Sequence, residues 1–199
     1  MWLRITAVFL VAGAGLLAED SATLGLVIRK GATVSAVVRE SFEADTALGV
    51  QSSFRDAKWV LVWRDEGSSS ASESYDRLIV VAFKGDCSTV MPKSAYGNGP
   101  LGWTSTSGDR VLPFIGIDCD RVKAALMAPE GWPHSIIPSG LLARALSHVA
   151  LHEIYHVLSE RKHHDAEGLF KAEYSPSDLL APVAMRPAGL AEIAGLPKR

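Results

Sequence analysis

The first half of the chain alternates short apolar runs with one longer amphipathic segment. Compact apolar runs with β-branched residues predict strands at residues 23–28, 58–63 and 78–83. Between the first two strands, apolar side chains recur at helical spacing, which predicts a helix over residues 34–48 that ends near Gly49. The expected order is therefore strand, helix, strand, strand.

The pattern continues with two further apolar runs around a glycine-containing turn. These runs, residues 101–104 and 111–117, predict two more strands. Proline cannot donate to a ladder, so Pro113 favours an edge position or a strand start for the second run. A short helix is expected over residues 120–127.

The longest helical pattern runs from a cap near Ser139 to about Glu160. Its leucine, valine and isoleucine residues lie all round the helix, so we expect it to be buried through the middle of the domain. Histidine and glutamate inside such a helix are costly unless they are paired or bind a metal. After this helix, glycine and proline interrupt the chain, and residues 177–181 predict a short helical turn at most.

The composition is that of an ordinary globular protein. The chain has 199 residues, of which 48% are hydrophobic and 21% are charged, as expected for one domain with a full core. Its formal charge of −2 and the lack of a basic cluster argue against a nucleic-acid partner. We expect a monomer.

Residues 1–18 have the pattern of a secretory signal. Arg4 supplies the positive end, an apolar run follows, and Ala18 offers a small residue for cleavage. The apolar run is short for a membrane span. We therefore expect residues 19–199 to form the mature domain, secreted or periplasmic, without stable membrane association after cleavage. An uncleaved anchor helix is the alternative.

The chain has two cysteines, Cys87 and Cys119. In an exported protein they predict a single disulfide, and neither lies in a metal-binding pair. Two free buried thiols are the alternative.

The sequence His152-Glu153-Ile154-Tyr155-His156 carries the candidate chemistry. Two histidines four apart on a helix lie about 40° apart around its axis, so both imidazoles can bind one ion. Imidazole nitrogens suit Zn²⁺, and Glu153 between them can take a proton from a water on that ion. The sequence therefore predicts a zinc site with His152 and His156 as ligands and Glu153 as general base.

A zinc site needs at least a third protein ligand. His148 and His156 are eight residues apart, about 12 Å along the axis, which is too far for both to bind one ion comfortably with His152. His163 and His164 follow the helix, and either can reach the metal if the chain turns back near Glu160. Carboxylates remain alternatives for the third ligand; they are Asp165, Glu167 and Glu173.

Residues 151–158, with the histidine pair at 163–164 and Gly168-Leu169, resemble an exported zinc-metallopeptidase-like family of soil bacteria. The resemblance covers most of residues 23–180. It implies a zinc-dependent hydrolase in which His164 is the third ligand. Further matching segments lie upstream, at residues 84–87, 100–104, 111–114 and 117–122.

The order of elements is also similar to that of the metzincin peptidases. This implies an α+β fold of the zincin type, with a mixed twisted sheet packed on the buried zinc helix. The sequence departs from the metzincin motif because Ser159 replaces a glycine and His164 comes two residues late. Met185 can correspond to the methionine turn of those enzymes, or it can be an ordinary loop residue.

The expected function is hydrolysis of peptide bonds in peptide or protein substrates by a zinc-activated water. An extended substrate could pair with the predicted edge strand at residues 101–104. Trp103 and Trp132 are candidates for lining the cleft, and Tyr155 and Tyr174 for binding the oxyanion. The alternatives are an inactive zinc-binding module on the same fold and a zinc hydrolase of non-peptide amides.

Overall fold

The structure is a computed structural model, and it describes residues 21–54, 58–68, 72–91, 99–127, 135–166 and 168–182. Several predictions lie outside these residues: the signal segment 1–18, Trp132, Glu167 and Met185.

The described residues form one five-stranded mixed sheet with the spatial order β2-β1-β3-β5-β4. The first four of these strands run parallel to their neighbours, and β4 pairs antiparallel with β5 at one edge. All five strands predicted from the sequence are present. They are β1 (Ser21–Ile28), β2 (Lys58–Asp65), β3 (Arg77–Lys84), β4 (Gly102–Ser107) and β5 (Arg110–Asp118).

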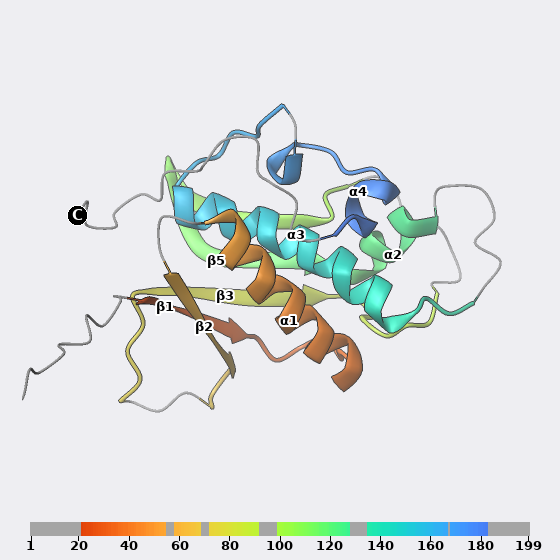
Figure 1. Cartoon of the computed structure of the whole chain (residues 1–199), viewed down its shortest axis with the longest axis horizontal. Coiled ribbons are helices and arrows are strands. Elements are labelled where there is room, and N and C mark those ends of the chain that lie inside the picture. The colour runs from red at the N-terminus through yellow and green to blue at the C-terminus, as the bar shows by residue number, and fades with distance from the viewer. Residues whose placement is uncertain are drawn as a thin grey trace, which may run out of the picture.

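Two long helices, α1 and α3, lie side by side against one face of the sheet (Figure 1). The buried residues of the sheet and both helices form one hydrophobic core, so the chain has the predicted α+β architecture. The helices are α1 (Ala36–Ser53), α2 (Cys119–Met127), α3 (Ser139–Ser159) and α4 (Pro176–Leu180), with a 3-10 turn at Gly168–Phe170.

The helix ends differ from the predicted ones in two places. Helix α1 begins at the N-cap Ser35 and continues past Gly49, which is buried inside the helix. Ser139 is the first helical residue of α3 rather than its cap, because Pro138 precedes it and no side chain caps the helix. A fixed proline φ favours this helix entry without a capping hydrogen bond.

Pro113 was predicted to mark an edge or the start of a strand, but β5 lies between β3 and β4. The pairing with β3 begins only at Phe114. On the other side, the register with β4 shifts between Thr104 and Thr106, opposite the proline. The proline is tolerated in an inner strand because it lies at this irregularity, where a missing N–H costs little.

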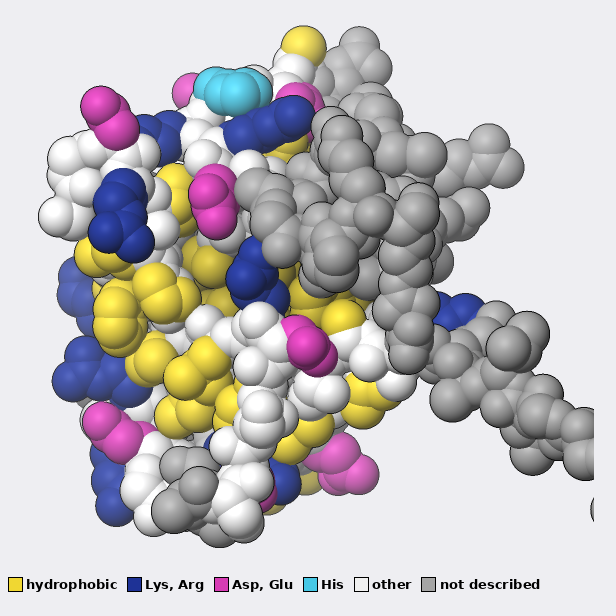
Figure 2. All heavy atoms as spheres, turned by 90° about the vertical axis from the view of Figure 1, so that its left-hand side faces the viewer, with side chains coloured by type: hydrophobic (Ala, Val, Ile, Leu, Met, Phe, Trp, Pro, Cys, Tyr) yellow, Lys and Arg dark blue, Asp and Glu magenta, His cyan; other side chains and the backbone are white. Residues whose placement is uncertain are grey.

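Several apolar side chains remain on the surface of the sheet strands. Val60, Leu78 and Phe114 are 45–49% exposed, while their neighbours Ile79 and Ile115 are buried. Hydrophobic side chains gather on the face shown in Figure 2. None of the helices among the described residues is long and apolar enough to cross a membrane.

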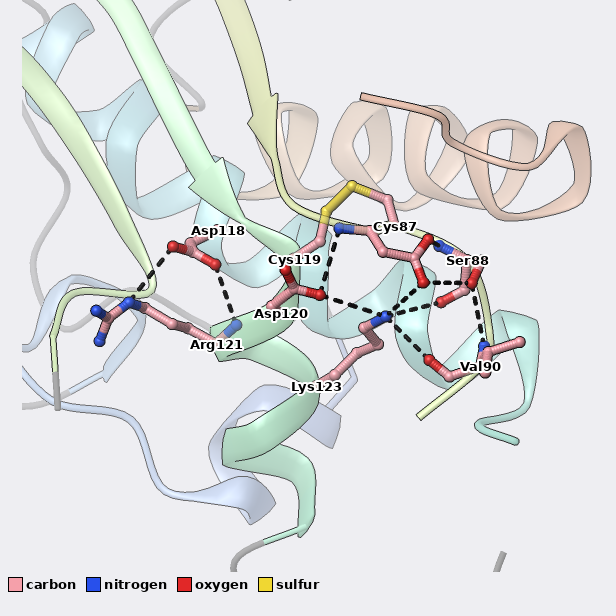
Figure 3. The surroundings of a disulfide bond; sticks show 9 residues. Cys87, Ser88, Val90, Asp118, Cys119, Asp120, Arg121 and Lys123 are labelled. Atoms are coloured by element: carbon pink, nitrogen blue, oxygen red, sulfur yellow. Dashed lines mark hydrogen bonds and ion pairs between the residues drawn. A yellow bond between two sulfur atoms is a disulfide. The ribbon is translucent and has the colours of Figure 1, made fainter. Parts of the chain in front are cut away.

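Cys87 and Cys119 form the predicted disulfide, which joins the segment after β3 to the start of α2 (Figure 3). Close to it, the buried ammonium of Lys123 donates to the carbonyl of Val90 at 2.9 Å and pairs with Asp86 at 3.3 Å. A buried cation needs such partners. The disulfide and Lys123 together fix the position of α2.

We predict that replacing both cysteines by alanine lowers the free energy of unfolding by about 3–4 kcal/mol, since the disulfide closes a loop with a sequence separation of 32 residues. The melting temperature should fall by on the order of 10 °C. Calorimetry of the variant and of the oxidised wild type measures this. Equal melting temperatures would contradict a stabilising role for the disulfide.

Candidate metal centre and cleft

Helix α3 positions the first three candidate residues. His152, Glu153 and His156 are each only 6% exposed, because α3 lies between α1 and the β4–β5 side of the sheet. The two histidines are one helical turn apart, and their rings lie 4.8 Å apart between centroids. The helix therefore brings both imidazoles together, as their spacing predicts.

The chain after α3 turns back and brings His164 to the same place. The helix ends at Ser159, and Glu160 makes the turn with a left-handed backbone, at φ 55°. The ring of His164 then lies 5.0 Å from the rings of both His152 and His156. One ligand atom from each of the three histidines lies within 4.8 Å of the others, close enough to hold one metal ion.

The other candidates for the third ligand do not join this group in the described part of the chain. His163 and Asp165 are not among the grouped ligands, and the backbone of Asp165 bridges to Lys171. Glu173 lines the neighbouring cavity but is not one of the grouped ligands. The structure therefore favours His164 over these three residues.

His148 lies one turn before His152 and has a different environment. Its Nε2 is 2.9 Å from the carbonyl oxygen of Ala181, and the side chain is buried. Burial lowers the pKa of this imidazole, which the hydrogen bond only partly opposes. His148 therefore links α3 to the end of α4, in agreement with its exclusion as a ligand.

A hydrogen bond at Nδ1 determines the tautomer of His156. Nδ1 lies 2.7 Å from the carbonyl oxygen of Arg161, which can only accept, so Nδ1 carries the proton and donates it. Its Nε2 therefore has a free lone pair, 3.1 Å from Nε2 of His152. Burial, more than any neighbour, lowers the pKa of His156 and so favours the neutral imidazole. Neutral imidazole is the form that binds metals.

His152 also has a hydrogen-bond partner at its Nδ1 atom, and this role of the partner was not predicted from the sequence. Its Nδ1 lies 3.0 Å from the hydroxyl of Tyr174, which is half-buried beside the helix. Partners of this kind orient metal-binding histidines and select their tautomer. The sequence named Tyr174 only as an oxyanion candidate, because a contact 22 residues away leaves no spacing signal.

Glu153 lies on the side of α3 that faces β4, and its side chain is buried. Its Oε2 accepts a hydrogen bond of 2.6 Å from the hydroxyl of Thr104 on β4. Burial raises the pKa of Glu153 to about 7, and the bond from Thr104 opposes this rise. Such a carboxyl group can take up and release a proton near neutral pH.

A cavity of about 580 Å³ opens beside the three histidines. Strand β4 forms one wall, and Tyr174 and the segment before it lie among the lining residues. Trp103 lines the cavity as predicted, whereas Tyr155 is buried in the core and stacks on Phe170 at 3.7 Å between centroids. Tyr155 is therefore a core residue rather than an oxyanion ligand.

No protein-family model matches this chain, and no curated protein sequence is significantly similar to it.

We predict that His164→Ala weakens Zn²⁺ binding by more than about 100-fold, which exceeds the loss expected from changing an outer partner. His163→Ala is the matched control, because it removes an adjacent imidazole that lies outside the group. Competition with a chromogenic chelator measures both affinities. If only His163→Ala weakened Zn²⁺ binding, the third ligand would be His163 and not His164.

The segment that carries Tyr174 is anchored by Asp178 at the start of α4. Its carboxylate accepts from the backbone of Ser175 and from Lys171, each at 2.7 Å. Burial raises the pKa of Asp178, but these hydrogen bonds outweigh it and lower the pKa to about 2. The charged carboxylate therefore stabilises the fold above about pH 4, and this contribution is lost as the pH falls towards 2.

We predict that Asp178→Asn lowers the stability at pH 7 by on the order of 1 kcal/mol, because the charged acceptor for Lys171 and for the Ser175 backbone is lost. The difference from the wild type should shrink as the pH falls from about 4 towards 2, since the wild-type carboxylate is then protonated. Melting temperatures of the zinc-free proteins across this pH range test this. A difference that does not change with pH would contradict it.

Proposed function

We propose that this protein is a zinc-dependent peptidase. The observation that carries the proposal is the placement of the buried Glu153 beside three converging histidines at an open cavity. Metal-assisted hydrolysis of amides uses this combination of groups.

The donor set fits zinc. In a tetrahedral zinc site with Zn–N bonds of about 2.0–2.1 Å, two ligand nitrogens lie about 3.3–3.4 Å apart. The Nε2 atoms of His152 and His156 are 3.1 Å apart, and the Nδ1 atom of each ring faces a hydrogen-bond partner. Three histidines leave a fourth coordination position for reaction, as in catalytic rather than structural zinc sites.

Zinc, when bound, makes water more acidic and polarises a carbonyl group. Glu153 takes one proton from the attacking water, and the oxygen of that water bonds to the peptide carbonyl carbon. The carbon–nitrogen bond then breaks, and Glu153 returns the proton to the leaving amine nitrogen. His152, His156 and His164 would hold the metal. Tyr174 and the Arg161 carbonyl are hydrogen-bond partners of the His152 and His156 rings and keep them in place.

The substrate lies along β4 in this proposal. Among the described residues, β4 pairs only with β5, and in this proposal an extended peptide pairs with its other edge. The same strand lines the cavity from Gly102 to Thr104. Strand addition of this kind supplies affinity through main-chain hydrogen bonds.

The wider setting that we propose is a secreted or periplasmic enzyme with a zincin-type fold, related to the exported family that the sequence resembles. The disulfide between Cys87 and Cys119 supports this setting, since disulfides persist in oxidising compartments. The helix α3 against a mixed sheet with an antiparallel edge strand supports the fold.

We predict that Glu153→Gln retains one zinc per chain and lowers kcat by at least about 100-fold, because it removes the group that accepts the proton. Hydrolysis of casein and of a fluorogenic peptide library, with stoichiometric zinc, provides the assay.

Wild-type protein with bound zinc but no hydrolysis of any peptide would contradict the peptidase proposal. It would favour the alternative of an inactive zinc-binding module. Turnover of non-peptide amides alone would favour the other alternative.

A further inference from the structure

Strand β4 does more than border the cavity, because it contacts Glu153 at two positions. Thr104 binds one carboxylate oxygen, and Gly102 lies against the other. Both residues are on the face of the strand that points towards α3, since side chains two apart share a face.

The hydroxyl of Thr104 donates to Oε2 of Glu153 at 2.6 Å and also lies 3.3 Å from the carbonyl oxygen of Glu153. No other hydrogen bond to the Glu153 carboxylate is found among the described residues. A glutamate side chain has three rotatable bonds, so this contact restricts a group that would otherwise have several orientations.

Gly102 gives the second oxygen its space. A Cβ atom at this position would lie 2.9 Å from Oε1 of Glu153 and 2.6 Å from Val149. Any side chain at residue 102 would therefore push the carboxylate or the helix away from β4. The strand holds Oε2 and leaves room for Oε1.

We propose that Thr104 and Gly102 are positioning residues for Glu153, so that one strand both pairs with the substrate and orients the general base. This inference rests on the proposed function. The carboxylate has two separate tasks: Oε2 is held by Thr104, while Oε1 remains available to exchange a proton.

The expected effect follows from the cost of misplacing a catalytic group, which reaches about 100-fold for a displacement of about 1 Å. Thr104→Ala frees the carboxylate and should lower kcat by about 10–100-fold. KM should change by less than twofold, because Thr104→Ala keeps the main-chain groups of β4. The affinity for zinc should change by less than about threefold, since the three histidines are untouched.

Two variants separate this role from a general loss of structure. Thr104→Ser keeps the hydroxyl and should restore kcat to within about threefold of the wild type. Ser105→Ala removes a hydroxyl from the next residue of β4, which does not line the cavity, and should leave kcat unchanged. Gly102→Ala should lower kcat in the same way as Thr104→Ala, with its folding checked by melting temperature.

Binding of a peptidyl hydroxamate to the zinc-loaded proteins gives a readout that does not require turnover. A hydroxamate binds zinc and shares its proton with the general base, so Thr104→Ala and Glu153→Gln should each weaken it at least about 10-fold. Titration calorimetry measures this, with Ser105→Ala as the control.

If Thr104→Ala binds the hydroxamate as the wild type does, the positioning role is wrong even if the enzyme is an active peptidase. A second outcome is that the wild type hydrolyses no peptide while Thr104→Ala still weakens hydroxamate binding. In that case the peptidase proposal is wrong, and the positioning of Glu153 by Thr104 is supported. Equal losses of zinc affinity and kcat would reduce Thr104 to a structural residue. A zinc-loaded wild type that binds no hydroxamate would overturn both proposals.

Discussion

The structure depends on one constraint: polar side chains inside helix α3 must have partners because they are removed from water. His148, His152, Glu153 and His156 are all almost fully buried in this helix. An unpaired buried polar group costs on the order of 1–3 kcal/mol, and a charged one costs more. Each side chain is therefore met by a different part of the chain. The segments packed around α3 are largely the ones that supply these partners.

Most of those partners come from segments that are far away in the sequence, and only the Arg161 carbonyl lies close to its partner His156. The hydroxyl of Thr104 is 49 residues from Glu153, and the hydroxyl of Tyr174 is 22 residues from His152. Because every partner belongs to a different segment, the site is complete only when the sheet edge, the turn after α3 and the segment before α4 are in place. An isolated α3 peptide would therefore lack the partners of its histidines and of Glu153.

The sequence predicts the parts whose signal is periodic. All five strands and the buried helix follow from apolar spacing, and the pair His152 and His156 follows from helical geometry. The third ligand could be assigned only through the family resemblance. The path of the turn after α3 decides whether His163 or His164 reaches His152 and His156. Thr104 as a partner of Glu153 could not be predicted, since a threonine in a strand has many ordinary roles. The position of Pro113 also depended on pairing irregularities that composition does not encode.

The disulfide has a consequence for how the protein must be made. Strands β4 and β5 lie entirely between Cys87 and Cys119, so the cleft wall belongs to the covalently closed loop, whereas α3 lies outside it. In a reducing cytosol the strand that faces the histidines would lose this covalent tether, whereas α3 lies outside the loop that the disulfide closes. In protein from such a host, β4 and β5 would keep their strand pairing but not the covalent closure of the loop that contains them. Production in an oxidising host is therefore a condition for studying the whole site.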